Sequence, residues 1–599
     1  MELPQRPKED RFVKPGAFRQ LCEQISRYPG VAEIPVLFVY AFDPRTRLGP
    51  FFIHDRILIP GAARAVPAAL YAAGFRKIRV VLQSWNPRVR PSRALLDGDP
   101  IELLLVSSMQ IHSAEAYRLI EDAWELGDSR PLILAGGPKA IYQPWDFYGL
   151  GPDGSRGADV VVCGEEYVLL ELLDRILQDR LPGEPLRKAF QRVRARGLLE
   201  DIPGLVYRAE DRPGPPESLI YTGPQRLLQD LDELPLPIAS LGLFEPPHNN
   251  RELSSRPLSP DKFGKYAKIL TILSTRGCHF RCHYCPIPAY NQFSFRTRSP
   301  ESLVEEITHV KTLTGINTFF GADDNFFNDR ELVERIFQTM AQAKVGGQPF
   351  RDAIFFSTEA TVYDVHKNQD LIPLAREAGL RALWIGVEDL TGTLVKKGQG
   401  PERTRTVFSL LRKAGIAPMA MIIHHDGQPL WSWKGLYGLL NQVNFLRRVG
   451  ALTCQITLLT PSVGSKSYEK LFEEGKVLES VGGKPIEEYQ YDGNHCVATA
   501  SSSPIIRQLN MILGYVWFYN PVNLLTALGQ VDTFWKSRLE CQLLGMAGIG
   551  QSLYRMRNWL GRLMFGKIER HQSAPRPRFP LLSPESLLGV PSLAPAVGH

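Results

Sequence analysis

The sequence predicts an α/β protein in which two series of parallel strands alternate with helices. Short apolar runs followed by amphipathic stretches recur from residue 35 and again from residue 268. A segment rich in proline and polar residues separates the two series, and 599 residues are too many for one domain. Strands that alternate with helices in this way are typical of parallel sheets covered by helices.

The first series predicts a doubly wound sheet over residues 35–207, after an amino-terminal extension at 1–34. In such a sheet, ligands bind beyond the carboxyl ends of the strands. The strands are expected at 35–42, 77–85, 101–109, 131–137 and 158–166, and the small or polar residues at their ends are Ser107, Ser108, Gly136, Gly137, Gly164 and Glu165. Small and polar residues are also common in turns and helix caps, so each of these six residues could instead have a purely structural role.

Residues 208–264 are predicted to be a linker, because proline and charged residues dominate there and no period is sustained. The second series, 265–480, contains six strand-like runs that alternate with helices. This pattern predicts a partial (β/α)6 barrel with its site at the carboxyl ends of the strands. We expect a helical carboxy-terminal domain at 481–570 and a disordered tail at 571–599, where proline and serine are frequent.

Composition and charge exclude several classes of protein. The net charge of +7 does not indicate a nucleic-acid binder unless it is concentrated in one region, and eight cysteines in so long a chain are no disulfide framework. The polar start, MELPQRPKED, lacks the apolar core of a signal peptide, so we expect a cytoplasmic protein. The uncharged run at 508–531 is long enough to cross a bilayer, but its asparagines and Pro521 favour buried or interfacial helices.

Cys278, Cys282 and Cys285 follow the first strand of the second series with the spacing C-x3-C-x2-C. Three thiolates on one loop suit a [4Fe–4S] cluster and leave one iron open to a cosubstrate. Zinc needs a fourth ligand, and His279 and His283 lie nearby, but the common zinc motifs pair two knuckles. The cluster is the favoured interpretation, with zinc and chance as alternatives. The remaining cysteines occur singly and are expected to be ordinary thiols: Cys22, Cys163, Cys454, Cys496 and Cys541.

The segment CHFRCHYC resembles the signature of the radical S-adenosylmethionine superfamily. In that family the open iron binds the amino and carboxylate groups of S-adenosylmethionine, and the reduced cluster cleaves it to a 5′-deoxyadenosyl radical. The segments at 321–327 and 460–477 resemble the ends of the second and sixth barrel strands of these enzymes. Each carboxylate taken alone also fits a capping or solvated role. The resemblance implies that S-adenosylmethionine contacts Tyr284, Asp323, Asp324, Ser357, Glu359 and Glu388.

The amino-terminal domain resembles the cobalamin-binding domain of one branch of this superfamily. The resemblance rests on SSM (107–109), AGGPKA (135–140), DVVVCGEEYVLLELL (159–173) and LDELPLP (231–237). The usual cobalamin motif D-x-H-x-x-G is absent, since AFDPRTRLG (41–49) contains no histidine. We therefore expect base-off cobalamin without a histidine ligand and with an arginine at its lower face. The implied cobalamin contacts are Arg45, with Arg47 or Arg64 as alternatives, and Ser107, Ser108, Gly136, Gly137, Gly164 and Glu165.

Residues 536–570 carry a net charge of +5, and apolar residues recur there at steps of three or four from Trp535 to Leu563. Four glycines weaken this helical pattern. One interpretation is a helix that covers the barrel. The other is an interfacial helix on anionic lipid, which the preceding uncharged run favours.

Together the resemblances imply a cobalamin-dependent radical S-adenosylmethionine methyltransferase that methylates an unactivated carbon. The alternatives are a non-methylating radical reaction, such as cyclisation or ring rearrangement, and a non-catalytic corrinoid or iron–sulfur binding protein. We expect a small-molecule substrate related to lipids or isoprenoids, and an external flavodoxin- or ferredoxin-like electron donor. Residues 508–570 are expected to make peripheral contact with the inner face of the membrane, and no nucleic-acid partner is expected.

Overall fold

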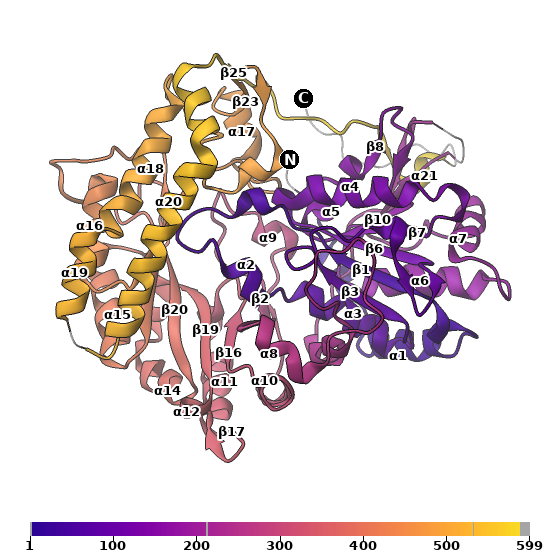
Figure 1. The fold of residues 1–599 in the computed structure, drawn as a ribbon, viewed down its shortest axis with the longest axis horizontal. Helices are drawn as coiled ribbons and strands as arrows, with labels where there is room; N and C mark the ends of the chain where they lie inside the picture. Colours follow the sequence, from indigo (N-terminus) through magenta and orange to yellow (C-terminus); the bar gives the residue numbers. More distant parts are fainter. Residues whose placement is uncertain (1–2, 211–213, 531, 588–599) are drawn as a thin grey trace. The chain divides into compact units, whose positions relative to one another are not determined.

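A computed structural model describes residues 3–210, 214–530 and 532–587 (Figure 1). The chain divides into two compact units that each combine segments distant in the sequence. Unit 1 contains Pro44–Gly61 and Asp261–Ala574, whereas unit 2 contains Leu3–Asp43, Ala62–Pro260 and the described residues from Pro575 on. These units differ from the predicted domains, because 44–61 leaves the first domain and most of the predicted linker joins unit 2.

Unit 2 is built on an eight-stranded sheet with the order β26-β12-β11-β10-β7-β6-β1-β3. Its five parallel strands occupy the ranges that the sequence predicts, and they read 2-1-3-4-5 in chain order, which puts the switch point between β1 and β6. The strands are β1 (Val36–Tyr40), β3 (Ile78–Leu82), β6 (Leu103–Ser107), β7 (Leu132–Gly136) and β10 (Val160–Val162). The longer helices that accompany them are α1 (Ala17–Ser26), α3 (Ala62–Ala72), α4 (Ser113–Trp124), α6 (Glu166–Asp179) and α7 (Leu186–Ala195).

Three short strands extend this sheet where the sequence predicts a linker and a tail. β11 (Leu205–Arg208) is antiparallel to β10, and β12 (Leu219–Tyr221) is antiparallel to β11. β26 (Leu581–Leu582) then pairs in parallel with β12, so this part of the predicted disordered tail is ordered. Strands of two to four residues leave no periodic pattern among prolines and charges, which explains why the sequence did not reveal them. Residues 588–599 of the predicted tail lie outside the described residues.

Unit 1 contains a seven-stranded sheet with the order β2-β13-β16-β19-β20-β21-β22, in which all pairings are parallel. Six of its strands confirm the predicted partial barrel, and β2 (Leu58–Ile59) adds a seventh beside the first. The six are β13 (Ile269–Ile272), β16 (Thr318–Gly321), β19 (Phe355–Thr361), β20 (Leu380–Glu388), β21 (Ala417–His424) and β22 (Thr453–Leu458). The longer helices between them are α10 (Pro300–Thr314), α11 (Arg330–Gln342), α15 (Pro401–Lys413) and α16 (Leu439–Arg448).

Local sequence fixes where these helices begin and end. The Ser299 side chain accepts a hydrogen bond from the Ser302 N–H at the start of α10, and Gly315, with φ of 72°, ends the helix. Asp329 caps α11 in the same way by accepting from the Leu332 N–H. The helices therefore return the chain to the sheet at defined positions, with the strand carboxyl ends together at one edge.

Three helices follow the barrel: α18 (Pro504–Phe518), α19 (Pro521–Gly529) and α20 (Trp535–Phe565), drawn side by side in orange and yellow in Figure 1. The uncharged run breaks at Pro521, as expected. Within the described residues, no helix combines the length and apolar content that crossing a bilayer requires.

Two of the four glycines of α20 serve close packing, whereas a Cβ at Gly550 or Gly561 would meet nothing within 4 Å. A Cβ at Gly545 would lie 2.2 Å from the Tyr519 ring, and one at Gly548 would lie 2.3 Å from the Gly49 carbonyl oxygen. The predicted apolar stripe is divided between two environments. Met556 and Leu563 are buried, whereas Leu543 and Leu553 are exposed.

Candidate functional site

The three cysteines lie on the loop that follows β13, at the carboxyl edge of the sheet in unit 1. The loop turns at Gly277, whose φ is +106°, and a Cβ there would lie 2.1 Å from the Ser294 carbonyl oxygen, so only glycine fits. All three thiols are free and half-buried. Burial raises the pKa of Cys278 to about 11 and that of Cys285 to about 12, so burial by itself favours the protonated thiols.

Hydrogen bonds hold this cysteine loop from the ends of three other strands. Two come from the segment after β16, one from the segment after β20 and one from the segment after β22. Because each end of the loop and its middle are fixed, the thiols occupy one defined region of the edge. The donors and acceptors are Gly277 N–H to Asp324 Oδ2 (2.7 Å), His279 N–H to Asn328 Oδ1 (2.8 Å), His283 Nε2 to Leu394 O (2.9 Å) and Ser467 N–H to His283 O (2.9 Å).

The two histidines of the loop are engaged elsewhere. His283 donates through Nε2 to a backbone carbonyl, and His279 Nε2 lies 3.7 Å from Asp364 Oδ2. In the part of the chain that the structure describes, no group of three or more His, Cys, Asp or Glu side chains is placed to hold one metal ion. Three free thiols on one fixed loop are a donor set that fits a [4Fe–4S] cluster.

Asp323, which follows β16, is hydrogen-bonded to the segment after β13 and to β19. It is 1% exposed and accepts hydrogen bonds from the Ser274 hydroxyl, from the N–H and hydroxyl of Thr275, and from the Thr358 hydroxyl, at 2.6 to 2.8 Å. The predicted contact with S-adenosylmethionine would require Asp323 to exchange these partners. Ser357 is also committed locally, since its hydroxyl donates to the Phe319 carbonyl at 3.2 Å.

The other predicted carboxylates of the barrel influence each other's ionisation. Burial raises the pKa of Asp324 to about 6, although the Gly277 N–H lowers it. Burial, and then the charges of Asp324, Asp323 and Glu388, raise the pKa of Glu359 to about 8. The structure thus brings Asp324, Glu359 and Glu388 to one side of the barrel edge, where they form an acidic wall suited to a cationic ligand.

Glu388 has the most unusual backbone of this group. Its φ is +56°, in a region that non-glycine residues rarely adopt, and the register of β20 against β21 shifts there. Its Oε1 lies 2.7 Å from Nζ of Lys397, which is buried. Burial alone would lower the pKa of Lys397, but Glu388 and the thiols of Cys282 and Cys278 raise it.

Lys397 therefore places a cation beside the cysteine loop, and no motif in the sequence identified it. Tyr284 belongs to the same cluster, because burial, then Glu388 and the thiols of Cys282 and Cys285, raise its pKa above the usual range. The only signal for Lys397 is its position nine residues after a strand-end glutamate, a spacing that carries no pattern of its own.

The carboxyl edge of unit 2 is lined by small residues. Ser107 and Gly136 are opposite each other in the register of β6 and β7. The Ser108 hydroxyl is fully buried and finds no hydrogen-bond partner among the described residues. A Cβ at Gly136 would meet nothing closer than the Val162 carbonyl oxygen at 4.0 Å, so this position faces open space. An orphaned hydroxyl beside an open cradle fits a flat, polar-edged ligand such as a corrin.

Gly137, Gly164 and Glu165 are fixed by packing within unit 2. Gly137 has φ of +89°, and a Cβ there would lie 2.8 Å from the Ser107 hydroxyl oxygen. A Cβ at Gly164 would lie 2.6 Å from the Val168 side chain. The Glu165 N–H donates to the Gln225 side chain at 2.7 Å. Packing and hydrogen bonds within unit 2 therefore explain these three residues without a ligand.

The candidate lower-face residues lie in different places. Arg45 belongs to unit 1, where it pairs with Glu487 at 2.5 Å and stacks 3.9 Å over the Tyr489 ring. Arg47 pairs with Asp55, and Arg64 is fully buried in α3.

The sequence also gave no reason to single out His112, which is buried after β6. Its Nδ1 accepts from the Asp43 N–H at 3.1 Å, and burial lowers its pKa to about 4. Its proton is therefore on Nε2, which leaves no ring lone pair for a metal.

Residues 272–440 match the model of the Radical SAM superfamily. An uncharacterized methyltransferase of Synechocystis is 26% identical over 219 residues, which are 36% of this chain and 39% of that protein. The cytidylyl-2-hydroxyethylphosphonate methyltransferase of Streptomyces wedmorensis is 22% identical over 35% of this chain and 39% of that protein. The hopanoid C-2 methylase of Rhodopseudomonas palustris is 24% identical over 21% and 23%. The chain thus spans about two fifths or less of these relatives.

Two solved structures share the fold over most of the chain. The radical S-adenosylmethionine methyltransferase TsrM from Kitasatospora setae, with cobalamin and a [4Fe–4S] cluster bound, has a TM-score of 0.56 and 15% identity over 86% of this chain and 99% of that one. The cobalamin-dependent S-adenosylmethionine radical enzyme OxsB has a TM-score of 0.55 and 15% identity over 88% and 75%. Residues 272–440 thus match the Radical SAM superfamily, and the chain shares the fold of these two cobalamin-dependent S-adenosylmethionine radical enzymes.

Proposed function

We propose that this enzyme is a cobalamin-dependent radical S-adenosylmethionine methyltransferase that methylates an unactivated carbon of a hydrophobic, lipid-like substrate. The cysteine loop, held at the carboxyl edge of a parallel barrel beside a buried cation, carries the proposal. The fold shared with a methyltransferase that binds cobalamin and a [4Fe–4S] cluster supports it.

In this proposal Cys278, Cys282 and Cys285 hold the cluster. Lys397 offsets the negative charge of the thiolates and keeps Glu388 in place. When bound, the reduced cluster supplies the electron that cleaves S-adenosylmethionine, and cobalamin supplies the methyl group. The carboxylates of Asp324 and Glu388 attract the ammonium and sulfonium groups of S-adenosylmethionine, Glu359 beside them keeps its proton up to about pH 8, and Tyr284 packs beside them.

In unit 2 the Ser108 hydroxyl and the open cradle at Gly136 receive the corrin. In this proposal the cobalamin is base-off and has no histidine ligand, and the Nδ1 of His112, the histidine at this edge, is already taken by the Asp43 N–H. The electron comes from an external flavodoxin- or ferredoxin-like donor.

The test is anaerobic reconstitution with iron, sulfide and hydroxocobalamin, followed by incubation with S-adenosylmethionine and a low-potential reductant. We expect both 5′-deoxyadenosine and S-adenosylhomocysteine, because methylation through cobalamin consumes one methyl donor and cleaves another. Lipid extracts of cells that express the gene should gain a species heavier by one methylene group. Formation of 5′-deoxyadenosine without S-adenosylhomocysteine would indicate a non-methylating radical reaction, and neither product would indicate a binding protein.

The outward face of α18 supports the choice of a hydrophobic substrate. Apolar residues at helical spacing point to solvent, whereas Gln508 and Asn510 are buried on the inner face. The inner face also buries Met511, Tyr515 and Phe518, so α18 is apolar on both sides, whereas a helix that only covers a barrel is polar on the side that faces solvent. α19 adds three more apolar side chains, of which Val522 is 70% exposed. The exposed apolar residues of the two helices are Ile506, Leu509, Leu513, Val516, Trp517, Val522, Leu525 and Leu528.

α18 also reaches the barrel edge. Arg507 donates to the carbonyls of His425 and Gln428 at 2.8 Å, at the end of β21. The loop that starts there exposes Trp431, Trp433 and Tyr437, with Trp433 95% exposed. Aromatic side chains with a polar tip are favoured at membrane interfaces. We infer that α18, α19 and this aromatic loop lie against an anionic bilayer, at the inner face of the cytoplasmic membrane.

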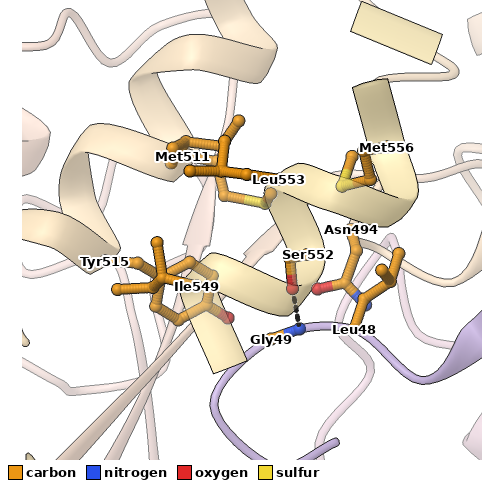
Figure 2. Close-up of a pocket in the computed structure, with 10 residues that line it drawn as sticks. Leu48, Gly49, Asn494, Met511, Tyr515, Ile549, Ser552, Leu553 and Met556 are labelled. Carbon is orange, nitrogen blue, oxygen red and sulfur yellow. Dashed lines mark hydrogen bonds between the residues drawn. The ribbon is translucent and has the colours of Figure 1, made fainter. Parts of the chain in front are cut away.

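A small apolar crevice lies beside α18. Figure 2 shows it between α18, α20 and the segment at Leu48, with the Gly49 N–H donating to Ser552 Oγ at 2.8 Å. Its volume is about 20 Å³, which seats one methyl-sized group and not a whole substrate. Met511 and Met556 on its wall are flexible side chains that adapt to an apolar guest.

Flotation with liposomes tests the membrane contact. The protein should float with anionic vesicles at low salt, and less at high salt, because exposed charges are screened over about 8 Å at physiological ionic strength. Val522→Asp with Leu525→Asp should abolish flotation. Leu313→Asp, at an exposed leucine of α10, is the matched control and should not change it. Equal and negligible flotation of the wild type under all conditions would remove the support for a lipid substrate and leave the methylation proposal standing.

A further inference from the structure

Asp389, the residue that follows Glu388 at the end of β20, is a fully buried carboxylate. Its Oδ2 lies 3.7 Å from His425 Nε2, and among the described residues no Lys or Arg pairs with it. Burial alone would raise the pKa of Asp389, but polar contacts with His425 and Gln442 hold this pKa well below its usual range. A buried charge without a strong cationic partner needs several hydrogen-bond donors, and these donors show what the carboxylate holds.

Most donors to Asp389 come from the loop that follows it. Its Oδ2 accepts from the Thr393 N–H at 2.7 Å and from the Leu394 N–H at 3.1 Å. Its Oδ1 accepts from the Thr391 N–H at 3.1 Å and from the Thr391 hydroxyl at 2.8 Å. Gln442 of α16 donates to the same Oδ1 through Nε2 at 2.7 Å. The carboxylate thus gathers the backbone N–H groups of one loop and connects them to a helix.

This loop, residues 391–397, is hydrogen-bonded to the cysteine loop of unit 1. The Leu394 peptide group is held on both sides, because its N–H donates to Asp389 and its carbonyl accepts from His283 Nε2 at 2.9 Å. His283 directly follows Cys282. A continuous chain of contacts therefore runs from the buried carboxylate to a residue beside a thiol.

The same loop carries the buried cation of the site. Lys397 Nζ lies 2.7 Å from Glu388 Oε1. The Lys397 N–H donates to Gln399 Oε1 at 3.0 Å, and Gln399 Nε2 donates to the Asp389 carbonyl at 3.0 Å. The side chain and the backbone of Asp389 thus both contribute to the position of Lys397.

The arrangement requires a carboxylate rather than an amide. Both oxygens of Asp389 face N–H or hydroxyl donors, so the NH2 group of an asparagine would meet a donor in either orientation. An aspartate that only shapes a turn accepts from its own backbone two residues on, as Asp389 does from Thr391. The further bonds to Leu394 and Gln442 exceed what a turn needs.

We propose that Asp389 is a positioning residue of the iron–sulfur site, which fixes the loop 391–397 so that the Leu394 carbonyl holds His283 and Lys397 stays beside the thiols. This role rests on the proposed function, because the cluster is the group that the cysteine loop would hold. Asp389 acts through the loop, since its own hydrogen bonds go to the loop and to α16.

Alkylation of the full-length chain before reconstitution tests the contact with the cysteine loop. Iodoacetamide labelling of its three thiols, followed by peptide mass spectrometry, measures how often the loop opens. Asp389→Asn should label roughly tenfold faster, because a hydrogen bond to a charged group favours the closed state by about that factor. The matched control is Asp159→Asn, at a half-buried carboxylate of unit 2 that accepts from the Ile133 N–H at 2.9 Å. It should label at the wild-type rate.

The effect on labelling should depend on His283. His283→Phe alone should also speed labelling, because it removes the bond to the Leu394 carbonyl. On that background Asp389→Asn should add less than about twofold, since substitutions that break one chain of contacts are not additive.

A redox titration after reconstitution, followed by electron paramagnetic resonance, tests the contribution of Lys397. A cation beside the cluster favours the reduced state, which carries one more negative charge. Asp389→Asn and Lys397→Met should therefore both shift the midpoint potential to a more negative value, and the double variant should shift it no further than Lys397→Met. Thr391→Val removes only a hydroxyl donor and should produce a smaller shift of the same sign, which decides the question if Asp389→Asn does not fold.

The positioning role would be overturned if Asp389→Asn labelled and titrated like Asp159→Asn, or if its effects added fully to those of His283→Phe and Lys397→Met. A wild-type potential in Thr391→Val would overturn it where Asp389→Asn does not fold. A wild-type chain that assembles no cluster would instead contradict the proposed function, and the labelling rates would still show whether Asp389 holds the cysteine loop.

Discussion

The carboxyl edges of the two sheets differ in the side chains that they present. In unit 1 the edge is crowded with charged side chains, and the cysteine loop is hydrogen-bonded to three strand ends. In unit 2 the edge offers an orphaned serine hydroxyl and the open face of a glycine. The difference teaches that, under the proposed function, one edge holds ligating atoms in place and the other leaves room for a ligand. Substitutions should therefore damage the first by removing groups and the second by adding them.

The largest effect should come from the cysteine loop itself. Replacing Cys278, Cys282 or Cys285 by Ala should remove bound iron and all cleavage of S-adenosylmethionine, because the cluster depends on all three thiolates. Iron analysis and 5′-deoxyadenosine assays measure this. Cys454→Ala, at a buried free thiol of β22, should alter neither. Normal iron content in the triple variant would rule out the cluster at this loop.

Lys397→Met should sharpen the comparison by leaving the thiols in place and removing the cation beside them. Outer groups around metal ligands typically contribute 10- to 100-fold, so we expect cleavage of S-adenosylmethionine to fall by about that factor. The partly buried Glu388 also loses its partner at 2.7 Å. Lys396→Met changes the exposed neighbour and should behave as wild type. Equal activity of the two variants would mean that Lys397 only closes its loop.

Two neighbouring glycines of unit 2 are expected to have different roles: Gly136 leaves space for a ligand, and Gly137 is required by the conformation and packing of the chain. Gly136→Leu should fold normally and weaken hydroxocobalamin roughly tenfold, because overpacking a filled contact costs about 1–3 kcal/mol. Gly137→Ala should instead lower the free energy of unfolding by about 1–3 kcal/mol, since its φ is +89° and its Cβ would meet Ser107. Visible spectra and urea titrations distinguish the two. Unchanged cobalamin affinity in Gly136→Leu would contradict a corrin at this edge.

The acidic wall of unit 1 predicts a pH dependence. The pKa of Glu359 is raised from 4.5 to about 8, chiefly by burial, so the native state holds a proton that the unfolded state has released between these values. The free energy of unfolding should therefore decline as pH rises from about 4.5 to 8. Glu359→Gln should lose this decline and gain stability over wild type at pH 9 but not at pH 4. Glu473→Gln, at an exposed glutamate, should track wild type at both values.

The smallest effect is expected at Ser108, and its sign is informative. Ser108→Ala removes a buried hydroxyl without a partner among the described residues, which should raise apo stability by up to about 1 kcal/mol. The same change should weaken hydroxocobalamin a few-fold if the hydroxyl binds it. A loss of stability together with unchanged cobalamin binding would place the partner of this hydroxyl inside the protein.

Periodic apolar runs were enough to predict the five parallel strands of unit 2 and the six barrel strands, because each is buried and bounded by turns. The cysteine spacing likewise predicted its own loop. Lys397 and His112 could not be identified from the sequence, because a single buried polar residue produces no periodic pattern. That residues 44–61 belong to unit 1 could not be predicted for a different reason. Only the two residues of β2 pair with the barrel, and a pairing so short and so distant in sequence has no local signature.

The short strand β26 limits how this protein can be divided into fragments that fold. Among the described residues the chain passes from one unit to the other four times, after Asp43, Gly61, Pro260 and Ala574. No single break separates the units, and a fragment that stops at residue 210 lacks β12 and β26. During synthesis the sheet of unit 2 must wait for its last strand until the whole of unit 1 has left the ribosome. Fragment expression is therefore a poor route to either half, whereas a tag or fusion at the carboxyl end, after the helix α21 (Pro584–Leu587), leaves every strand of the described residues in place.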